Sequence, residues 1–546
     1  MSKETTLKTL ILTETAGKAR TLKKFLGRSF LVISTDGFLR DLPKSRLGID
    51  EENYSPEYIK VRGKAPLVKE IEKESLNARR VFFAMNPDGA GEFLSKQCCE
   101  LFGVNAKSKC RIFLDELTKD KIKNLQDYAR PIDENLVKSF QARQIIDKFV
   151  SQKIGDYLSC KIYRGVKVGR FRVLLLKLIT EKKIDGKIIL EKKFTPAVMQ
   201  ELAFQKLNFS AAKTRVIAEQ LFEGVSLNDD ERTGLIKFPH GEEIFLTDEK
   251  RTPESVKEFL SDGQFQLYNL IFNQSEKKVD EKFILGGECS DASLMAALDK
   301  LGIDWAEVYA GGISSLLKRN YITAENSTYK ITPTGKKVLE ALDGFFDEDF
   351  SSDSYKKLSV QFSEIAEGKA EKISVIENYC NVFVKNFEQA MNELGENATP
   401  QKQPDELSDE ICDKCGKPML IKRGRYGKFL ACSGYPECKN AKPILEYLDK
   451  KCPKCGKRLT KRLFGKRNSF ICEDFPACDF STWDEPQEKP CKVCGGTMFL
   501  HKFKERTPMF YCGNENCETR KNHPMNKIIA ESKKRYEARK NKKAKK

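Results

Sequence analysis

Twelve cysteines near the end of this 546-residue chain fall into three sets of four, and they constrain the fold more than any other feature. Each set contains a C-x2-C pair, a gap of 16 or 17 residues, and a second pair spaced C-x5-C or C-x4-C. A C-x2-C turn brings two thiolates to one zinc ion, and a returning β-hairpin can supply the other two. Each set therefore predicts a closed tetrahedral site that holds one structural zinc ion. The twelve ligands are Cys412, Cys415, Cys432, Cys438, Cys452, Cys455, Cys472, Cys478, Cys491, Cys494, Cys512 and Cys517.

The spacing of these cysteines predicts three zinc ribbons, at residues 411–440, 451–481 and 490–522. Such small units bury little apolar surface, so the metal has to supply much of their stability. Disulfide pairing is the alternative, but three equivalent quartets favour zinc in a chain that we expect to be cytoplasmic. The other six cysteines are scattered, and we expect buried free thiols at Cys98, Cys99, Cys110, Cys160, Cys289 and Cys380.

Positive charge is concentrated in the same part of the chain. Residues 411–546 carry 34 Lys+Arg against 15 Asp+Glu, a net charge of +19, whereas the whole chain carries +18. The first 410 residues are therefore close to neutral, at 63 basic against 64 acidic side chains. Because this positive electrostatic field is confined to the ribbons, we expect the ribbons to bind a polyanion. Residues 523–546 form a basic tail that adds nonspecific phosphate contacts.

Basic and aromatic side chains alternate between the two cysteine pairs of each ribbon. Aromatic rings that stack on unpaired bases, next to cations that contact phosphates, are typical of single-strand binding. The alternative is that the rings fill the small cores of the ribbons. The residues are Lys422, Arg423, Arg425, Tyr426, Lys428, Phe429, Lys461, Arg462, Phe464, Lys466, Arg467, Phe470, Lys502, Phe503, Lys504, Arg506, Phe510 and Tyr511.

The first 410 residues predict two further parts. Residues 1–128 alternate short apolar strands with helices, which indicates an α/β domain with a parallel sheet. Residues 129–394 are dominated by helical periodicity, including continuous helices at 196–222 and 355–394, and contain a winged-helix-like pattern at 290–332. Residues 395–410 are rich in Asn, Gln, Pro and acidic residues, and they predict a linker. No apolar run reaches membrane-spanning length, so we expect a cytoplasmic, nucleoid-associated protein with no membrane partner.

Several strings in this first part resemble bacterial type IA DNA topoisomerases. Residues 10–21 (LILTETAGKART) are similar to the opening of a Toprim domain, and residues 40–50 (RDLPKSRLGID) form a longer specific match. Residues 115–118, Gln141-Ala-Arg143 and residues 194–224 fit the same family. The resemblance implies a Toprim α/β domain, a mainly helical DNA-groove domain and zinc ribbons. It also implies single-strand cleavage by a tyrosine that works beside a Mg2+-binding carboxylate cluster.

The positions that carry cleavage in this family are altered. Glu14 and Lys18 are present, but the family's Asp-x-Asp-x-Glu triplet is Asn86-Pro-Asp88-Gly-Ala90 here. Only Asp88 remains of the triplet, which makes Mg2+ binding doubtful because Mg2+ needs several oxygen ligands. Alignment places Phe238 at the tyrosine position, or Ile244 if an insertion precedes Thr247-Asp248. Neither side chain can form a phosphotyrosyl bond, because neither has a hydroxyl group. We therefore expect Glu14, Lys18 and Asp88 to be vestigial.

The resemblance also implies DNA contacts at Lys18, Arg40, Arg143, Arg170 and Arg172. Only 14 residues separate Ile179 from Phe194, where the family inserts part of its arch. Much of the arch and of the domain that carries the tyrosine is therefore expected to be missing.

We interpret the chain as a DNA-binding homologue that does not cleave DNA and that prefers single strands. Partners of such a protein include RNA polymerase or an active topoisomerase. The alternative is an active type IA DNA topoisomerase that relaxes negatively supercoiled DNA by transient single-strand cleavage. A Toprim nuclease is a third hypothesis, but it also depends on the acidic triplet.

Overall fold

The structure is a computed structural model in which the chain divides into two compact units, residues 1–403 and 404–546. The described residues are 7–181, 186–189, 194–228, 232–239, 243–275, 282–285, 289–301, 303, 309–325, 328–395, 398–401, 406–424, 427–444, 446–464, 467–502, 508–521, 523–526 and 528. None of the helices in these residues is long and apolar enough to cross a membrane.

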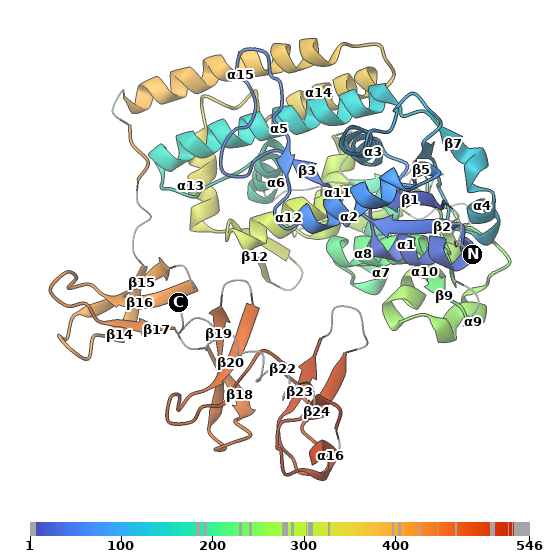
Figure 1. The fold of residues 1–546 in the computed structure, drawn as a ribbon. Coiled ribbons are helices and arrows are strands. Elements are labelled where there is room, and N and C mark those ends of the chain that lie inside the picture. The colour runs from blue at the N-terminus through green and yellow to red at the C-terminus, as the bar shows by residue number, and fades with distance from the viewer. Residues whose placement is uncertain are drawn as a thin grey trace. The chain divides into compact units, whose positions relative to one another are not determined.

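The first unit begins with an α/β domain built around one five-stranded sheet, in the order β2-β1-β5-β6-β7 (Figure 1). The sheet is parallel except for β7, which confirms the predicted α/β class. Side chains alternate along β1, so Ile11 joins the core under α1 while Leu10 and Leu12 join the core under α2 and α3. The strands are β1 (Thr9–Thr13), β2 (Phe30–Ser34), β3 (Arg40–Asp41), β4 (Ile59–Lys60), β5 (Arg80–Phe83), β6 (Arg111–Ile112) and β7 (Ala129–Arg130). The helices are α1 (Ala16–Phe25), α2 (Ala65–Leu76), α3 (Gly89–Phe102) and α4 (Lys119–Lys123), with a 3-10 turn at Leu125–Tyr128.

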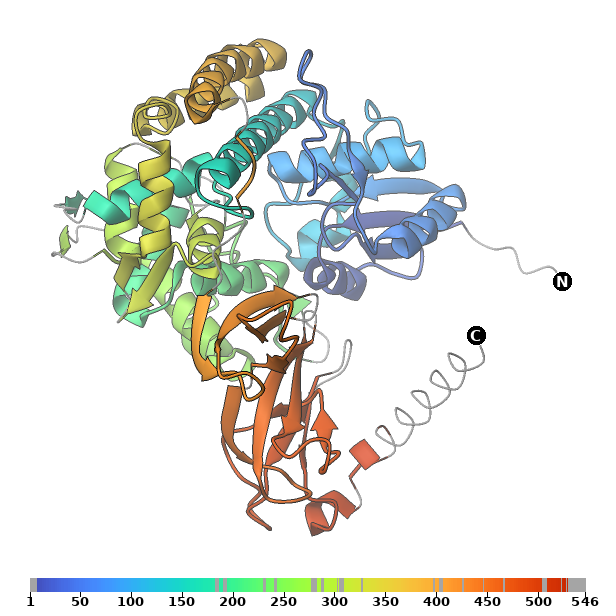
Figure 2. The ribbon, with the colours of Figure 1, turned by 90° about the vertical axis from the view of Figure 1, so that its left-hand side faces the viewer.

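The rest of this unit is mainly helical, as expected, and the long helix α5 leads into it from the α/β domain (Figure 2). Two predicted continuous helices are each broken in two. Asn208 adopts φ 53° between α7 and α8, and Gly368 adopts φ 74° between α14 and α15. Both conformations are left-handed, which interrupts a right-handed helix and which Asn and Gly tolerate best. The helices are α5 (Glu134–Lys161), α6 (Arg170–Glu181), α7 (Pro196–Leu207), α8 (Ala211–Glu223), α9 (Pro253–Val256), α10 (Asp262–Ser275), α14 (Ser352–Ala366) and α15 (Lys372–Leu394).

Three two-stranded sheets complete the described residues of the helical part. Helices α11 (Asp291–Lys300) and α12 (Tyr309–Lys318) precede the antiparallel hairpin of β12 (Ile322–Glu325) and β13 (Thr328–Ile331), and α13 (Pro333–Leu342) follows it. The winged-helix-like order was predicted. The second sheet pairs β8 (Gly186–Ile189) with β11 (Lys282–Leu285). Strand β8 lies within the connection between Ile179 and Phe194, where the family resemblance led us to expect that part of the arch is missing. A further pair is β9 (Val225–Ser226) with β10 (Arg232–Thr233).

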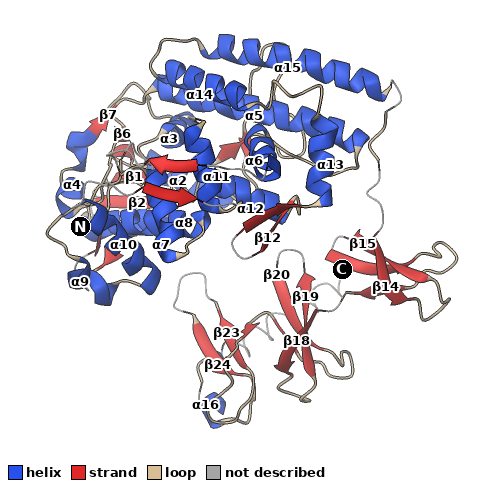
Figure 3. Ribbon diagram, turned by 180° about the vertical axis from the view of Figure 1, so that it is seen from behind, coloured by secondary structure: helices blue, strands red, loops and turns tan. Residues whose placement is uncertain are grey.

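The second unit contains three zinc ribbons, each built on an antiparallel sheet (Figure 3). Strand β14 lies within the predicted linker and already pairs with ribbon 1. Ribbon 1 has its own small core, whereas buried residues of ribbons 2 and 3 form one shared cluster. Ribbon 1 contains β14 (Glu406–Ile411), β15 (Pro418–Gly424), β16 (Gly427–Cys432) and β17 (Ala441–Pro443). Ribbon 2 contains β18 (Glu446–Lys451), β19 (Arg458–Phe464), β20 (Arg467–Cys472) and β21 (Ser481–Thr482). Ribbon 3 contains β22 (Glu485–Pro486), β23 (Met498–His501), β24 (Met509–Cys512) and α16 (Glu518–Lys521).

Candidate functional site

Lys18 lies at the centre of the polar residues that follow the first strand of the Toprim-like sheet. It sits in the first turn of α1, which Thr15 caps, and its side chain is only 1% exposed. Its Nζ donates a hydrogen bond to Asn86 Oδ1 at 2.7 Å and forms an ion pair with Glu14 Oε1 at 2.7 Å. The Lys18 ammonium therefore neutralises Glu14. It also donates to the amide oxygen of Asn86, which stands where the family triplet has its first carboxylate.

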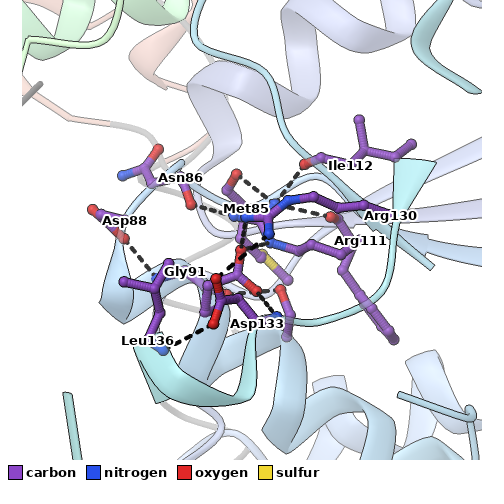
Figure 4. Close-up of polar contacts among 12 residues, drawn as sticks. Met85, Asn86, Asp88, Gly91, Arg111, Ile112, Arg130, Asp133 and Leu136 are labelled. Carbon is purple, nitrogen blue, oxygen red and sulfur yellow. Dashed lines mark hydrogen bonds and ion pairs between the residues drawn. The ribbon is translucent and has the colours of Figure 1, made fainter. Parts of the chain in front are cut away.

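Asp88 serves as the N-cap of helix α3 (Figure 4). Its Oδ1 accepts a hydrogen bond from the backbone N–H of Gly91 at 2.6 Å. Burial raises the pKa of Asp88, the Gly91 hydrogen bond opposes this shift, and the nearby Glu14 adds to it. The folded structure therefore disfavours a charged Asp88, although this is the one acid of the family triplet that remains.

Glu92 belongs to a buried ion-pair network that the sequence did not predict. Its Oε1 lies 3.0 Å from Arg111 Nε and 2.7 Å from Arg130 Nη2, and its Oε2 accepts from the backbone N–H of Asp133. Arg111 is fully buried, and its remaining N–H groups donate to backbone carbonyl oxygens, including those of Met85 and Asn86 (Figure 4). The Glu92 carboxylate thus stabilises the junction of α3 with β6 and β7, and its oxygens are already in use.

The acidic residues of this site do not fit a Mg2+ ion as they are arranged. Glu14 is paired with an ammonium group, Asp88 caps a helix, and Glu92 is held by two arginines. Mg2+ requires several oxygen ligands arranged in an octahedron. Among the described residues, the only groups of three or more ligand side chains gathered around one point are the three cysteine quartets.

The two candidate tyrosine positions are both buried in apolar surroundings. Phe238 packs edge-to-face on Phe222 with ring centroids 5.4 Å apart, and the same Phe222 ring lies 5.4 Å below Lys18 Nζ. The backbone N–H of Phe238 donates to the carbonyl oxygen of Asp115, in a segment that matches the family. Ile244 lies in the same hydrophobic cluster. Tyr268, a tyrosine near this segment in sequence, is buried and donates its hydroxyl to the carbonyl oxygen of Arg251.

The arginines expected to contact DNA occupy different environments. Arg170 is buried, donates two hydrogen bonds to Asp147 Oδ1 at 3.0 and 2.7 Å, and stacks over two tyrosine rings. This arrangement makes Arg170 a structural side chain that anchors α6 to α5. Arg40 is half-buried near Glu100, and Arg143 lies 5.5 Å from the ring centroid of Phe362. DNA contacts by these arginines remain predictions.

Arg172 and Lys148 each lie near a second cation, and acidic side chains (Asp147 near Arg172, Asp41 and Asp156 near Lys148) partly offset this. Burial lowers the pKa of Arg172, and neighbouring Arg319 lowers it further. Burial and Lys167 lower the pKa of Lys148 in the same way. Mutually repelling, partly desolvated cations favour the arrival of an anion. The sequence analysis did not predict Lys148, Lys167 or Arg319. They are far apart in sequence, and a basic side chain alone does not indicate a DNA contact.

The three cysteine quartets are arranged as zinc ligands. In each quartet the ligand atoms all lie within 4.8 Å of one another. The closest Sγ–Sγ pairs are 3.2–3.7 Å in ribbon 1, 3.3–3.8 Å in ribbon 2 and 3.4–3.8 Å in ribbon 3. Tetrahedral Zn–S bonds of about 2.3 Å place sulfurs about 3.8 Å apart. The chain therefore has three four-thiolate sites for three structural zinc ions, as predicted.

The ribbon aromatics divide between core and surface. Phe470 and Tyr511 are buried, which agrees with the alternative that such rings fill the cores, whereas Phe510 is exposed. Four exposed rings were missed, at Tyr447, Trp483, Tyr435 and Phe475. Tyr435 and Phe475 stand three residues before the fourth cysteine in ribbons 1 and 2. Their identical place in two repeats is a signal that could have found them. The side chains of Arg423, Arg425, Tyr426, Lys428, Phe464, Lys466, Phe503, Lys504 and Arg506 lie outside the described residues, as does almost all of the basic tail.

Comparisons with known proteins agree with this organisation. The Toprim domain model matches residues 9–117, and the model of the topoisomerase DNA-binding C4 zinc finger matches residues 409–447 and 449–487. The chain is therefore a Toprim-domain protein with topoisomerase-type zinc ribbons. It is also similar to the solved structure of full-length topoisomerase I from Thermotoga maritima, at a TM-score of 0.61 and 20% identity, covering 80% of this chain and 97% of that chain. Its fold is that of topoisomerase I, and the resemblance to bacterial type IA topoisomerases is confirmed in domains and fold.

Proposed function

We propose that this chain binds single-stranded DNA as a type IA topoisomerase homologue that no longer cleaves it. The observation that carries the proposal is the pairing of Lys18 with Glu14 and Asn86, beside an apolar cluster that holds Phe238. The chemistry needs an attacking hydroxyl and a metal-binding set of carboxylates. At one of the two candidate positions for the attacking hydroxyl the chain has the phenyl ring of Phe238. The Lys18 ammonium already pairs with Glu14, one of the carboxylates that a metal ion would need.

Two features support DNA binding by the same chain. The first is two pairs of neighbouring cations in the helical part, Arg172 with Arg319 and Lys148 with Lys167, whose repulsion a phosphate backbone would relieve. The second is the set of basic ribbons with the exposed rings of Tyr435 and Phe475, which suit stacking on unpaired bases. The expected loss of the strand-passage gate rests on the sequence alone, in which 14 residues separate Ile179 from Phe194.

Relaxation of negatively supercoiled plasmid in the presence of Mg2+ tests the loss of cleavage. We expect no relaxation and no covalent protein–DNA complex after denaturation. The matched control is the double variant Lys18→Ala, Asp88→Ala, which separates intrinsic activity from a contaminating host enzyme. Relaxation by the wild-type protein that disappears in the double variant would overturn the proposal. Relaxation that persists unchanged in the variant comes from the contaminant and leaves the wild-type chain inactive, as proposed.

Binding of labelled oligonucleotides tests the DNA-binding half of the proposal. We expect tighter binding of single strands than of duplexes, weakened by salt and by zinc chelation. The double variant Arg172→Ala, Arg319→Ala should reduce the slope of log Kd against log salt by about 1.4, because each lost phosphate contact on a single strand contributes about 0.7. Arg46→Ala is the matched control, since Arg46 is exposed and paired with Glu57. An equal slope in all three proteins would exclude Arg172 and Arg319 as DNA contacts.

A further inference from the structure

Two buried cysteines of the α/β domain have their sulfur atoms in contact. Cys99 lies in the last turn of α3, Cys110 directly precedes β6, and their Sγ atoms are 4.0 Å apart. The two residues are 4% and 2% exposed. In the described part of the chain outside the ribbons, no other two thiols are in hydrogen-bond contact. The pair is therefore a feature of its own, separate from the zinc ligands and from the polar residues around Lys18.

The backbone holds both cysteines in position. The carbonyl oxygen of Cys99 accepts hydrogen bonds from two N–H groups of the turn that follows α3, and that of Cys110 accepts from the N–H of Phe83 in the neighbouring strand. A disulfide bond needs sulfurs about 2.05 Å apart, so the two atoms have to approach by about 2 Å. Side-chain rotation and a small shift of the turn at residues 103–109 can supply this, because most residues of that turn are exposed to solvent.

The two thiols differ in acidity. With Cys99 as the donor, the hydrogen bond between them lowers the pKa of Cys110; burial opposes this shift, and the Ser108 hydroxyl and the Arg111 guanidinium add to it. The same hydrogen bond raises the pKa of Cys99, and burial raises it further. The thiolate is the form of cysteine that reacts with oxidants. Cys110 is therefore the side chain that reacts first, and Cys99 is the neighbour that keeps its proton.

We propose that Cys99 and Cys110 form a reversible disulfide bond when the chain meets a hydroperoxide. The Cys110 thiolate attacks the terminal peroxide oxygen, so that an S–O bond forms and the O–O bond breaks. The leaving alkoxide or hydroxide takes up the proton that Cys110 released. The Cys99 sulfur then attacks the Cys110 sulfur, the S–O bond breaks, and water leaves with the Cys99 proton. In sum, two thiols and one hydroperoxide give one disulfide, one water and one alcohol, or a second water when the oxidant is hydrogen peroxide.

The disulfide bond joins the end of α3 to the start of β6. The ion pair of Glu92 with Arg111 already connects the same two elements through the first turn of α3. Cys99 and Cys110 are 11 residues apart in sequence, and closing a loop of this size should make unfolding of the α/β domain about 100-fold less favourable. In a reducing compartment such bonds are transient, because small thiols cleave them again. Exposure to an oxidant is thus converted into a change in the stability of this domain.

Mass spectrometry of the full-length, zinc-loaded chain after brief treatment with hydrogen peroxide tests this proposal. The remaining thiols are alkylated, and trypsin then releases residues 97–107, which contain Cys99, separately from residues 110–111. We expect these two peptides to be disulfide-linked before the ribbons lose zinc and before Cys380, a fully buried thiol elsewhere in the first unit, is oxidised. Cys98→Ala is the matched control, because Cys98 is a buried thiol in the same peptide. This variant should keep the link, and Cys99→Ala should abolish it.

Denaturant titration of the same samples measures the consequence. The unfolding midpoint of the first unit should rise on oxidation, return after treatment with dithiothreitol, and stay unchanged by peroxide in Cys110→Ala. Oxidation of the wild-type chain that yields no linked peptide, or that proceeds no faster at Cys110 than at Cys380, would overturn the proposal. A link that persists in Cys99→Ala would assign the bond to Cys98 and would overturn it as well. A linked peptide without any shift of the midpoint would exclude the effect on stability.

Discussion

The shared core of ribbons 2 and 3 predicts that their two zinc sites are lost together. Phe499 of ribbon 3 is fully buried, and its ring lies 5.9 Å from that of Phe480 in ribbon 2 and 5.7 Å from that of Tyr511. Truncating such a phenylalanine to alanine costs about 3–5 kcal/mol. Because zinc binding and folding are coupled in ribbons, this loss weakens zinc binding by roughly 10²- to 10⁴-fold.

Stepwise chelation with a chromogenic zinc ligand measures this effect on the full-length chain. In Phe499→Ala, we expect two zinc ions to be released at low chelator concentration and the third to be retained by ribbon 1. Met419→Ala is the matched control, because Met419 is fully buried in the separate core of ribbon 1. That variant should release one ion early and keep two. Early release of a single ion from Phe499→Ala would refute the energetic coupling of ribbons 2 and 3.

Two further predictions concern the Toprim end. Asp88→Asn keeps the α3 cap but removes a carboxyl whose pKa is raised by burial. The stability that wild-type Asp88 contributes is fully present below its ordinary pKa and is lost as pH rises through its folded pKa. Thermal unfolding should therefore show a variant advantage that grows from acidic toward neutral pH, and an advantage independent of pH would contradict this. Arg111→Ala should destabilise the first unit by about 3–5 kcal/mol, because it leaves the buried Glu92 without its fully buried guanidinium partner. Arg46→Ala, at an exposed ion pair, should cost less than about 1 kcal/mol in the same denaturant titration, and equal losses in the two variants would contradict the role given to Arg111.

The features that sequence predicted well are those in which local pattern and structure have the same cause. Cysteine spacing determines which thiolates can share a zinc ion, so all twelve ligands could be identified. The apolar run Thr9–Thr13 could only be a strand buried on both faces. The winged-helix-like order followed from helix periodicity and a hairpin. The helix breaks were missed, because Asn208 and Gly368 carry no stronger signal than other polar or small residues.

The features that sequence could not predict depend on contacts between distant segments. Glu92 stands two residues beyond the altered acidic triplet, but Arg111 and Arg130, 19 and 38 residues further on, hold it in the core. Lys18 donates a hydrogen bond to Asn86, which is 68 residues away in sequence, and no local pattern predicts that contact. In the same way, repeat periodicity predicted three equivalent ribbons and could not show that the second and third share one core.

The shared core of ribbons 2 and 3 joins two small modules into one structural unit. Asp484 lies in the chain segment that links ribbon 2 to ribbon 3. Its carboxylate accepts a hydrogen bond from the Tyr511 hydroxyl and lies 2.7 Å from His501 Nδ1, and these contacts hold the link in place. Ligands bound to the two ribbons would then be held at a constant distance and orientation from one another. Such a joint converts two weak encounters into one local event at high effective concentration. The geometry of that joint would therefore set how this pair of ribbons engages a ligand long enough to reach both.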